Sequence, residues 1–519
     1  MRIFSSLLLI CLSFFVFGQD GYQAPPKAIT DLVKAPNTPG VSVNAQGDWM
    51  ALFDRPGYPG IVELAQPELR LAGLRINPKT NGSSRGYSYS GISLKRIEAG
   101  EPVPVKGIPT DARIQNISWS PDGKKIAFTN EVNGGIQLWI VDVAEGRAQQ
   151  LTEEVVNDAI GGSPYAWLPD SDHLLLKTLI SDRGEAPTAP LVPDGPTIQE
   201  TAGSKAPVRT YQDLLQNAHD EALFTYYTSS QLKMISLSEQ SFTSFGEPGI
   251  ISRVSPSPSG EYVLVNYVVE PFSYIVPYYR FAQRVVMYDA GGQAVQVIAE
   301  IPKAENIPKG FGAVRTGPRS FEWRADEPAT LAWVEAQDEG DPANETDIRD
   351  QLFLLPAPFD GEPTASIPFR LRFGGITWGS DDLAIGYEYW WSTRELVTSR
   401  FAPEEADSKT VLFERSFEDR YNDPGNFVTQ QLANGADVLL TDKRGRTLYL
   451  TGQGASPEGN RPFLRAFDLR KKTTEELWRS AAPYYETPVK VLDVNKGLLI
   501  TRRESKEQPP NYYLRDVKE

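Results

Sequence analysis

Residues 116–143 form the stretch that most constrains the fold of this chain, because their pattern fits a meander of short antiparallel strands. The sequence reads NISWSPDGKKIAFTNEVNGGIQLWIVDV. Three runs rich in apolar residues are separated by Ser-Pro-Asp-Gly and Asn-Gly-Gly, which suit tight turns because these residues accept the required φ angles. A sheet this small cannot bury both faces by itself, so the stretch predicts neighbouring copies of the same unit.

The unit recurs in degenerate form along the rest of the chain. Each copy has a strand, a small polar turn and a second apolar strand, and the copies are Val41–Phe53, Tyr165–Leu179, Ile251–Val268, Ser320–Val334, Gly375–Tyr387, Phe427–Thr441 and Val489–Thr501. With the opening stretch this gives about eight starts, spaced somewhat more widely than the ~40 to 50 residues of a propeller blade. The sequence therefore predicts an all-β fold, a β-propeller of seven or eight four-stranded antiparallel blades.

The first 18 residues have the features of a secretory signal peptide. Arg2 precedes a mostly apolar run, Ile3–Phe17, and the small residue Gly18 marks the cleavage site. The run is shorter than the ~20 residues that span a bilayer, and no later stretch is long and apolar enough to do so. Cys11, the one cysteine, lies inside the signal. We therefore expect export to the periplasm or the extracellular space, without disulfides and without a membrane span.

Residues 19–40 are predicted to be a lead-in segment with a short helix at Ala28–Lys34, and residues 41–519 a single propeller domain whose last blade is incomplete. A helical insertion is predicted at about 210–227, where TYQDLLQNAHDEALFTYY has helical apolar spacing. This helix either covers an exposed sheet edge or contacts a partner. Two other segments, Pro56–Gly91 and the acidic run Asp338–Asp350, are predicted to be surface loops.

Charge excludes one class of function. The chain has 67 acidic and 52 basic residues, a formal net charge of -15. No basic run offsets this negative field, which repels nucleic acid and anionic lipid. We expect no nucleic-acid partner.

No residue pattern in the chain predicts a reaction centre. Ser84 matches G-x-S-x-G, but no apolar strand leads into it and no helix follows, as a nucleophile elbow requires. The two histidines, His173 and His219, have no second ligand at metal spacing. Carboxylates such as Asp122, Asp381 and Asp382 occupy turn positions, where aspartate serves the turn. We therefore predict no catalytic residue, no metal site and no cofactor.

Two arginines stand out in the aromatic segment Glu270–Asp289. Arg280 and Arg284 lie close together on what reads as a connection between strands. Paired guanidinium groups can bind a carboxylate with two hydrogen bonds each. The alternative is that both are solvated or paired with nearby acids.

Several segments resemble the propeller half of glutamyl-endopeptidase-like members of the prolyl oligopeptidase family. They are Leu71–Arg85, Thr210–Leu232, Gly317–Ala336, Arg349–Phe359 and Gly386–Glu395. The resemblance covers nearly the whole chain after the signal. It implies an N-terminal propeller that caps a catalytic α/β-hydrolase domain, filters peptide substrates by size and helps to shape the substrate pocket.

The same resemblance implies that the catalytic domain is missing. The sequence ends at PPNYYLRDVKE, near where the last blade closes, so none of the family's catalytic triad maps onto it. We expect the chain alone to be inactive and its main partner to be the α/β-hydrolase domain. The family's preference for cutting after glutamate suggests that Arg280, Arg284 or Arg394 binds acidic peptide substrates.

Two alternatives remain open. One is a freestanding secreted propeller that acts as a binding or scaffold protein without catalysis. The other is a propeller hydrolase with its own site, such as a glycosidase, which needs two carboxylates held across the bond that breaks.

Overall fold

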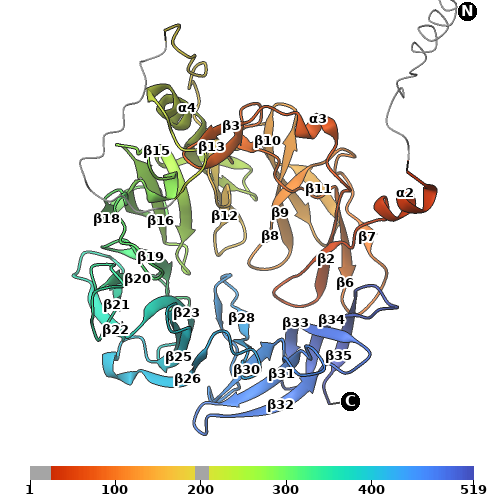
Figure 1. The fold of residues 1–519 in the computed structure, drawn as a ribbon. Coiled ribbons are helices and arrows are strands. Elements are labelled where there is room, and N and C mark those ends of the chain that lie inside the picture. Colours follow the sequence, from red (N-terminus) through yellow and green to blue (C-terminus); the bar gives the residue numbers. More distant parts are fainter. Residues whose placement is uncertain (1–24, 193–209, 519) are drawn as a thin grey trace, which may run out of the picture.

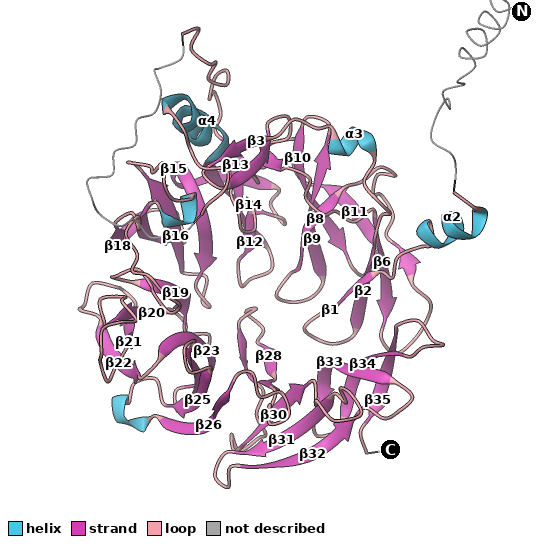
Figure 2. Ribbon diagram, in the orientation of Figure 1, coloured by secondary structure: helices cyan, strands magenta, loops and turns pink. Residues whose placement is uncertain are grey.

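The computed structural model describes residues 25–192 and 210–518, and in this part of the chain antiparallel strands dominate. The sheets are arranged in a ring, in the order of the sequence, with one edge of each sheet towards a common axis (Figures 1 and 2). The first and last sheets lie side by side, since the Lys490 ammonium donates a hydrogen bond to the Asn44 carbonyl. The predicted all-β propeller architecture is confirmed.

We number the sheets of the ring 1 to 7. Sheet 1 contains β1 (Gly40–Val43), β2 (Trp49–Asp54), β6 (Gly91–Arg96) and β7 (Val103–Pro104). Sheet 2 contains β8 (Ile114–Trp119), β9 (Lys125–Val132), β10 (Gly135–Asp142) and β11 (Arg147–Gln150). Sheet 3 contains β12 (Tyr165–Trp167), β13 (His173–Leu179), β14 (Ser229–Ser236), β15 (Ser241–Pro256), β16 (Tyr262–Val269), β17 (Ala282–Asp289) and β18 (Ala294–Ile301).

The remaining sheets follow in chain order. Sheet 4 contains β19 (Arg319–Trp323), β20 (Thr330–Ala336), β21 (Asp350–Pro356) and β22 (Thr364–Phe369), and sheet 5 contains β23 (Arg372–Ser380), β24 (Leu383–Trp390), β25 (Glu395–Phe401) and β26 (Thr410–Ser416). Sheet 6 contains β27 (Asn426–Phe427), β30 (Thr447–Gly452), β31 (Phe463–Asp468) and β32 (Thr473–Arg479), and sheet 7 contains β33 (Tyr485–Asp493), β34 (Leu498–Glu504) and β35 (Asn511–Asp516).

Sheet 3 joins two units of the ring through one long strand. The first half of β15 pairs with β14, and its second half pairs with β16, with a register shift between Ile251 and Arg253. The strand therefore completes the outer edge of one unit and then runs inward to begin the next. Each unit has four strands, as the sequence predicts for a blade.

The hydrophobic core lies between neighbouring sheets rather than at the centre of the ring. In β9, Ile126 and Phe128 pack against sheet 1, whereas Ala127 faces the cluster shared with β13. Such a strand is apolar on both faces because both faces are covered. Phe128 is fully buried, which contributes roughly 1.5–3 kcal/mol relative to an exposed side chain.

The predicted strand pairs agree with the structure at every start except one. At Phe427–Thr441 the sequence predicts the first two strands of a blade, but β27 is short and pairs with β30 instead. The residues between them form a separate hairpin of β28 (Thr429–Gln431) and β29 (Asp437–Leu439). The sequence predicts the turn correctly but not the sheet to which the hairpin belongs, because neighbouring residues set a turn and distant contacts decide where it lies.

Helices are few among the described residues. They are α2 (Lys27–Val33), α3 (Ile61–Leu64), α4 (Ala218–Thr228) and the 3-10 turns η1 (Tyr278–Arg280) and η2 (Ala406–Ser408). The short helix predicted at 28–34 is offset by one residue from the observed α2. None of these helices is long and apolar enough to cross a membrane.

The inserted helix is shorter than predicted. Expected at about 210–227, it begins at Ala218 because Asp213 has a φ of 59°, outside the helical region, and Asn217 caps the helix by accepting a hydrogen bond from the Asp220 N–H at 2.9 Å. The buried face of α4, at Phe224 and Tyr227, packs in one cluster with the excursion from sheet 1.

Two predicted surface loops are therefore wrong in part. The excursion at 56–91 contains a small sheet of β3 (Leu69–Leu71), β4 (Leu74–Asn77) and β5 (Gly82–Ser83), and its Leu71 and Ile76 are buried against α4. The acidic run at 338–350 is anchored at both ends, because Asp338 and Asp350 are buried and paired with Arg372 at 2.6 and 2.8 Å. The glycine content of the first segment and the acidic residues of the second predict exposed loops. Contacts with residues elsewhere in the chain bury parts of both segments instead.

Candidate functional site

The β28–β29 hairpin is the feature that distinguishes the centre of this ring. In Figures 1 and 2 it projects from sheet 6 towards the axis, apart from the strands of its neighbours. Its tip reaches two other sheets: the Asn434 side-chain amide donates to the Pro258 carbonyl at 3.1 Å, and Gly435 lies against Pro121. Gly435 has a φ of 87°, a conformation that glycine adopts without strain. The hairpin thus bridges turns that are far apart in the sequence.

The base of the hairpin is held by sheet 5. Leu439 of β29 is buried, and it packs over Gly379 at the end of β23. A Cβ atom on Gly379 would lie 2.9 Å from the Leu439 Cδ1 and 2.7 Å from the Leu383 carbonyl oxygen. The absence of a side chain at Gly379 therefore allows the hairpin to lie close to the ring wall.

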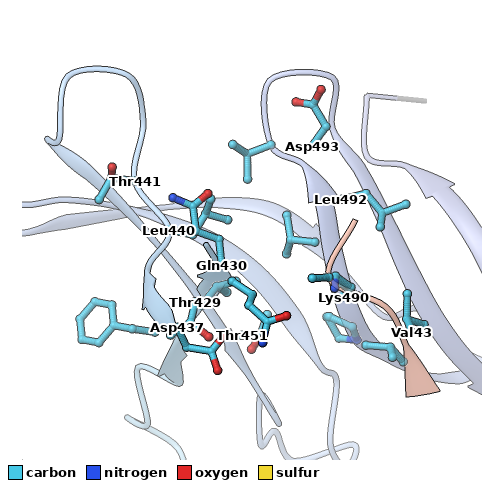
Figure 3. Close-up of a pocket in the computed structure, with 18 of the residues that line it drawn as sticks. Val43, Thr429, Gln430, Asp437, Leu440, Thr441, Thr451, Lys490, Leu492 and Asp493 are labelled. Atoms are coloured by element: carbon cyan, nitrogen blue, oxygen red, sulfur yellow. The ribbon is translucent and has the colours of Figure 1, made fainter. Parts of the chain in front are cut away.

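A cavity of about 970 Å³ lies beside the hairpin. Its walls come from the hairpin itself and from the inner strands of sheets 7, 1 and 2 (Figure 3). The lining includes amides, hydroxyls and carboxylates together with valine and leucine side chains, among them Val43, Ser118, Thr429, Gln430, Gln431, Asp437, Thr441, Thr451, Lys490, Leu492, Asp493 and Asn495. The volume is in the range of roughly 300–1,000 Å³ that is typical of ligand sites.

A second cavity of about 340 Å³ shares Trp119 and Gln431 with the first, and the tip of the hairpin also lines it. Its other walls are aromatic and proline side chains at the ends of the inner strands, which are Pro121, Trp167, Pro169, Pro256, Pro258 and Trp323. These residues belong to the repeated strand–turn units of the sequence. The repeated strand–turn units therefore surround the hairpin tip with apolar side chains.

Three charged side chains line the larger cavity: Asp437, Lys490 and Asp493. Asp437 extends from the hairpin side and Lys490 from β33, as Figure 3 shows. Burial raises the pKa of the Asp437 carboxyl, and the charge of Lys490 partly offsets this. Burial also lowers the pKa of the Lys490 ammonium, with a smaller opposing effect from Asp437. The two groups influence each other, but the structure forms no ion pair between them.

The three arginines predicted to bind substrate lie elsewhere. Arg280, in η1, stacks over the Tyr211 ring at 5.5 Å, and Arg284, in β17, lies 4.0 Å from the Glu247 carboxylate. Arg394, in the turn between β24 and β25, pairs with Glu418 at 2.9 Å and stacks on Trp391. Arg280 and Arg284 share sheet 3 and its connections, whereas Arg394 belongs to sheet 5. None of the three lines the 970 Å³ cavity, and their role in substrate binding stays a prediction.

The other sequence candidates have local structural partners. The Ser84 hydroxyl donates to Glu68 at 3.0 Å, and His173 Nδ1 lies 2.7 Å from Asp170 within a turn. Asp122 accepts hydrogen bonds from the Ser120 hydroxyl and the Lys124 N–H. These contacts agree with the sequence interpretation of Ser84 as a loop residue and of Asp122 as a turn residue.

The structure brings together three carboxylates whose proximity the sequence does not reveal. Asp326, Glu327 and Asp381 bring their oxygen atoms within 4.8 Å of one another. The buried Arg324 guanidinium lies among them, 2.8 Å from Asp326 and 3.5 Å from Asp381, with Glu404 at 3.1 Å. An arginine already neutralises this cluster, so the arrangement favours a structural ion network over a metal site.

Comparisons with known proteins give two curated relatives. The chain is 37% identical over 95% of its length to a probable chloroplastic glutamyl endopeptidase of Oryza sativa subsp. japonica, and 38% identical over 95% to the protein of the same name from Arabidopsis thaliana. It spans 55% and 54% of the length of these relatives. No protein-family model matches the chain.

Solved structures overlap more loosely. Porphyromonas gingivalis dipeptidyl peptidase 4 has a TM-score of 0.46 at 12% identity, covering 96% of this chain and 61% of that one. The β-propeller domain of a trilobed protease from Pyrococcus furiosus has a TM-score of 0.37 at 9% identity, covering 78% and 95%.

Proposed function

We propose that this chain is the β-propeller portion of a serine peptidase of the prolyl oligopeptidase family, and that it selects the peptides that reach a catalytic α/β-hydrolase domain. The observation that carries this proposal is the 37% identity over 95% of the chain to a protein named as a probable glutamyl endopeptidase. The chain spans about half of that relative. The catalytic domain, the cleavage after glutamate and the peptide substrates are all parts of the proposal.

The propeller in this proposal has eight blades. Sheet 3 counts as two blades that share β15, and the three strands of sheet 7 form the last one. The remaining sheets of the ring supply one four-stranded blade each. This count agrees with the eight repeat starts in the sequence.

The hairpin on the axis supports a role in size selection. Its tip contacts turns of sheets 2 and 3 through Gly435 and Asn434, so a peptide that moves along the axis must pass beside it. The two cavities that the hairpin lines have volumes of about 970 and 340 Å³. Spaces of this size admit an extended peptide and exclude a folded domain, whose radius of gyration is ~13 Å at 100 residues.

The chain by itself supplies no nucleophile in this proposal. Ser84, the one match to a nucleophile motif, is hydrogen-bonded to Glu68 rather than to a general base such as histidine. We expect the isolated chain to be inert towards serine-directed phosphonate probes. Stoichiometric labelling of the isolated chain would contradict this.

The proposal is tested first by the intact mass of the protein from its native source. A peptidase subunit should be heavier than this chain by a whole domain, roughly 250 to 300 residues, and should cleave short peptides after glutamate. Shortening the hairpin at residues 432–436 should then extend cleavage to larger substrates, while the rate with a short peptide changes little. A product that ends at Glu519 and copurifies with no hydrolase would refute the proposal.

The second candidate function is a freestanding propeller that binds ligands without catalysis. The large polar cavity beside the hairpin favours it, because the cavity is formed by this chain alone. The same mass measurement separates the two candidates, since a binding protein needs no additional domain.

Export remains a separate part of the proposal. The predicted signal peptide, residues 1–18, lies outside the described residues, and the two relatives are named as chloroplastic. We expect the processed protein to begin at Gln19. N-terminal sequencing of the native protein tests this, and an intact Met1 would exclude export by this signal.

A further inference from the structure

The 970 Å³ cavity is bordered by the edges of two strands. It is lined by every residue of the run Phe427–Gln431, which contains β28, and by every residue of Pro488–Asn495, which contains the end of β33. Successive side chains of a strand point to opposite faces, so a cavity on one face would be lined only by alternate residues. The cavity therefore lies alongside the two strands, where their backbone groups are. Figure 3 shows Thr429 and Gln430 on one side of this space and Lys490 on the other.

The register of the hairpin leaves one backbone edge of β28 free. The Leu432 N–H donates to the Ala436 carbonyl at 2.8 Å, which makes residue 432 a hydrogen-bonded position of the ladder. Such positions alternate along an antiparallel strand, so the N–H and C=O groups of Thr429 and Gln431 turn away from β29. Among the described residues, these backbone groups have no other partner. Both residues line the cavity.

The free edge of β28 has no feature that would prevent pairing with a further strand. Strand edges are usually protected by a charged residue, a proline or a bulge, and the run Thr429–Gln431 has none of these. The opposite side of the hairpin is covered, because Leu439 of β29 packs over Gly379 of sheet 5. The free edge lies inside the ring, where a cavity of about 970 Å³ has room for an extended peptide but not for the sheet of another folded protein.

From this geometry we infer that the cavity binds an extended peptide, which adds as a strand to the free edge of β28. The backbone groups of Thr429 and Gln431 pair with the peptide backbone, a mode in which main-chain hydrogen bonds give affinity and side-chain pockets give sequence preference. Other walls of the cavity carry Val43, Val489 and Leu492, which favour apolar side chains in the peptide. The site needs no catalytic domain, so the inference goes beyond the proposed function and stands if that function is wrong.

Isothermal titration calorimetry of the purified chain tests the inference with the blocked pentapeptide acetyl-Thr-Val-Thr-Val-Thr-amide. This peptide has no charge, and its β-branched residues favour the extended conformation. A series of derivatives carries one backbone N-methyl group each, at successive residues. We expect the affinity to fall about five-fold or more at alternate residues and to change less than about two-fold at the residues between, because only every second amide of an added strand faces β28.

A pair of variants tests the same pairing from the side of the protein. Thr429→Pro removes an N–H from the free edge without removing a hydrogen bond to β29, and proline is accepted at the first residue of an edge strand. Thr429→Ala is the matched control, because it shortens the side chain and keeps the N–H. We expect Thr429→Pro to weaken binding of the unmethylated peptide about five-fold or more, and Thr429→Ala to bind it within about two-fold of the unchanged chain. Thermal melting of each variant checks that it is folded.

Failure of the pentapeptide to bind at millimolar concentration would overturn the inference. So would a methylated series without alternation, which is measured on the unchanged chain and needs no variant. Equal losses in the proline and alanine variants, both folded, would assign binding to the Thr429 side chain and also contradict the added strand. The peptidase activity of the native protein is measured separately and bears only on the proposed function.

Discussion

Replacing Arg372 by methionine should be among the most destabilising single changes in the propeller. The Arg372 side chain is almost completely buried, and it donates to Asp338 at 2.6 Å, to Asp350 at 2.8 Å and to the Gly312 carbonyl at 2.8 Å. Both carboxylates are fully buried as well. Methionine has a similar length, so it fills the space but removes these three hydrogen bonds and one of the two guanidinium partners of each carboxylate.

The magnitude follows from what remains after the change. Asp338 keeps Arg349 and Asp350 keeps Arg319, so neither carboxylate is left with no charged partner. Removing one member of a buried ion network typically costs about 3–5 kcal/mol. Unfolding entropy scales with chain length, and for ~500 residues this corresponds to a fall in the melting temperature of about 3 to 5 °C.

The pH dependence should change in a defined direction. Burial alone would raise the pKa of Asp338, but hydrogen bonds and charges from Arg372 and Arg349 hold it below its usual value. A carboxyl with a lowered folded-state pKa stabilises the fold above its unfolded pKa of about 3.9, and this contribution is lost as the pH falls through the folded value. In Arg372→Met the pKa of Asp338 rises, so acid unfolding should begin at a higher pH.

The assay is urea denaturation followed by tryptophan fluorescence, together with melting curves between pH 7 and pH 3. Arg370→Met is the matched control, because Arg370 pairs with Glu395 and Glu414 on the surface and its side chain is 53% exposed. Exposed pairs contribute about 0–1 kcal/mol. If Arg372→Met were no more destabilising than Arg370→Met, the buried network would not have the role assigned to it here.

Three further predictions concern the inserted helix, a buried carboxyl and the substrate-binding arginines. Asn217→Ala removes the cap of α4 and should cost about 1 kcal/mol, seen as faster hydrogen exchange at 218–228; unchanged exchange would contradict the role of the cap. Burial raises the pKa of the Asp158 carboxyl to about 6. Between about pH 4 and pH 6 the folded state therefore holds a proton that the unfolded state has released. Lowering the pH through this range stabilises the folded state. Asp158→Asn, which imitates the protonated form, should raise the melting temperature at pH 7.5 more than at pH 5, and an equal effect at both would refute the shift. In a complete peptidase, replacing Arg280, Arg284 or Arg394 by alanine should lower kcat/KM for a glutamyl substrate relative to a neutral one, and an unaltered ratio for all three would exclude their role in substrate binding.

The sequence alone determined the structural elements that depend on residues adjacent in the chain. The alternation of apolar residues and the turn residues between them located the strand pairs, because a hairpin is specified by residues that are adjacent in the chain. The same reasoning predicts that Ser84 is not a nucleophile, since a nucleophile elbow has a local pattern that the chain lacks around it. The resemblance to glutamyl endopeptidases also came from contiguous segments.

Only the tertiary structure decided where these elements lie relative to one another. The hairpin at 429–439 looks like a blade start in sequence, yet it leaves its sheet because its tip binds Pro258, 176 residues away in the chain. Asp338 and Asp350 look solvated in an acidic run, yet they are buried because Arg372 neutralises them. Asp437 and Lys490 are unremarkable in sequence and share a cavity only when the ring closes. Burial and charge pairing depend on partners distant in the chain, so local pattern does not reveal them.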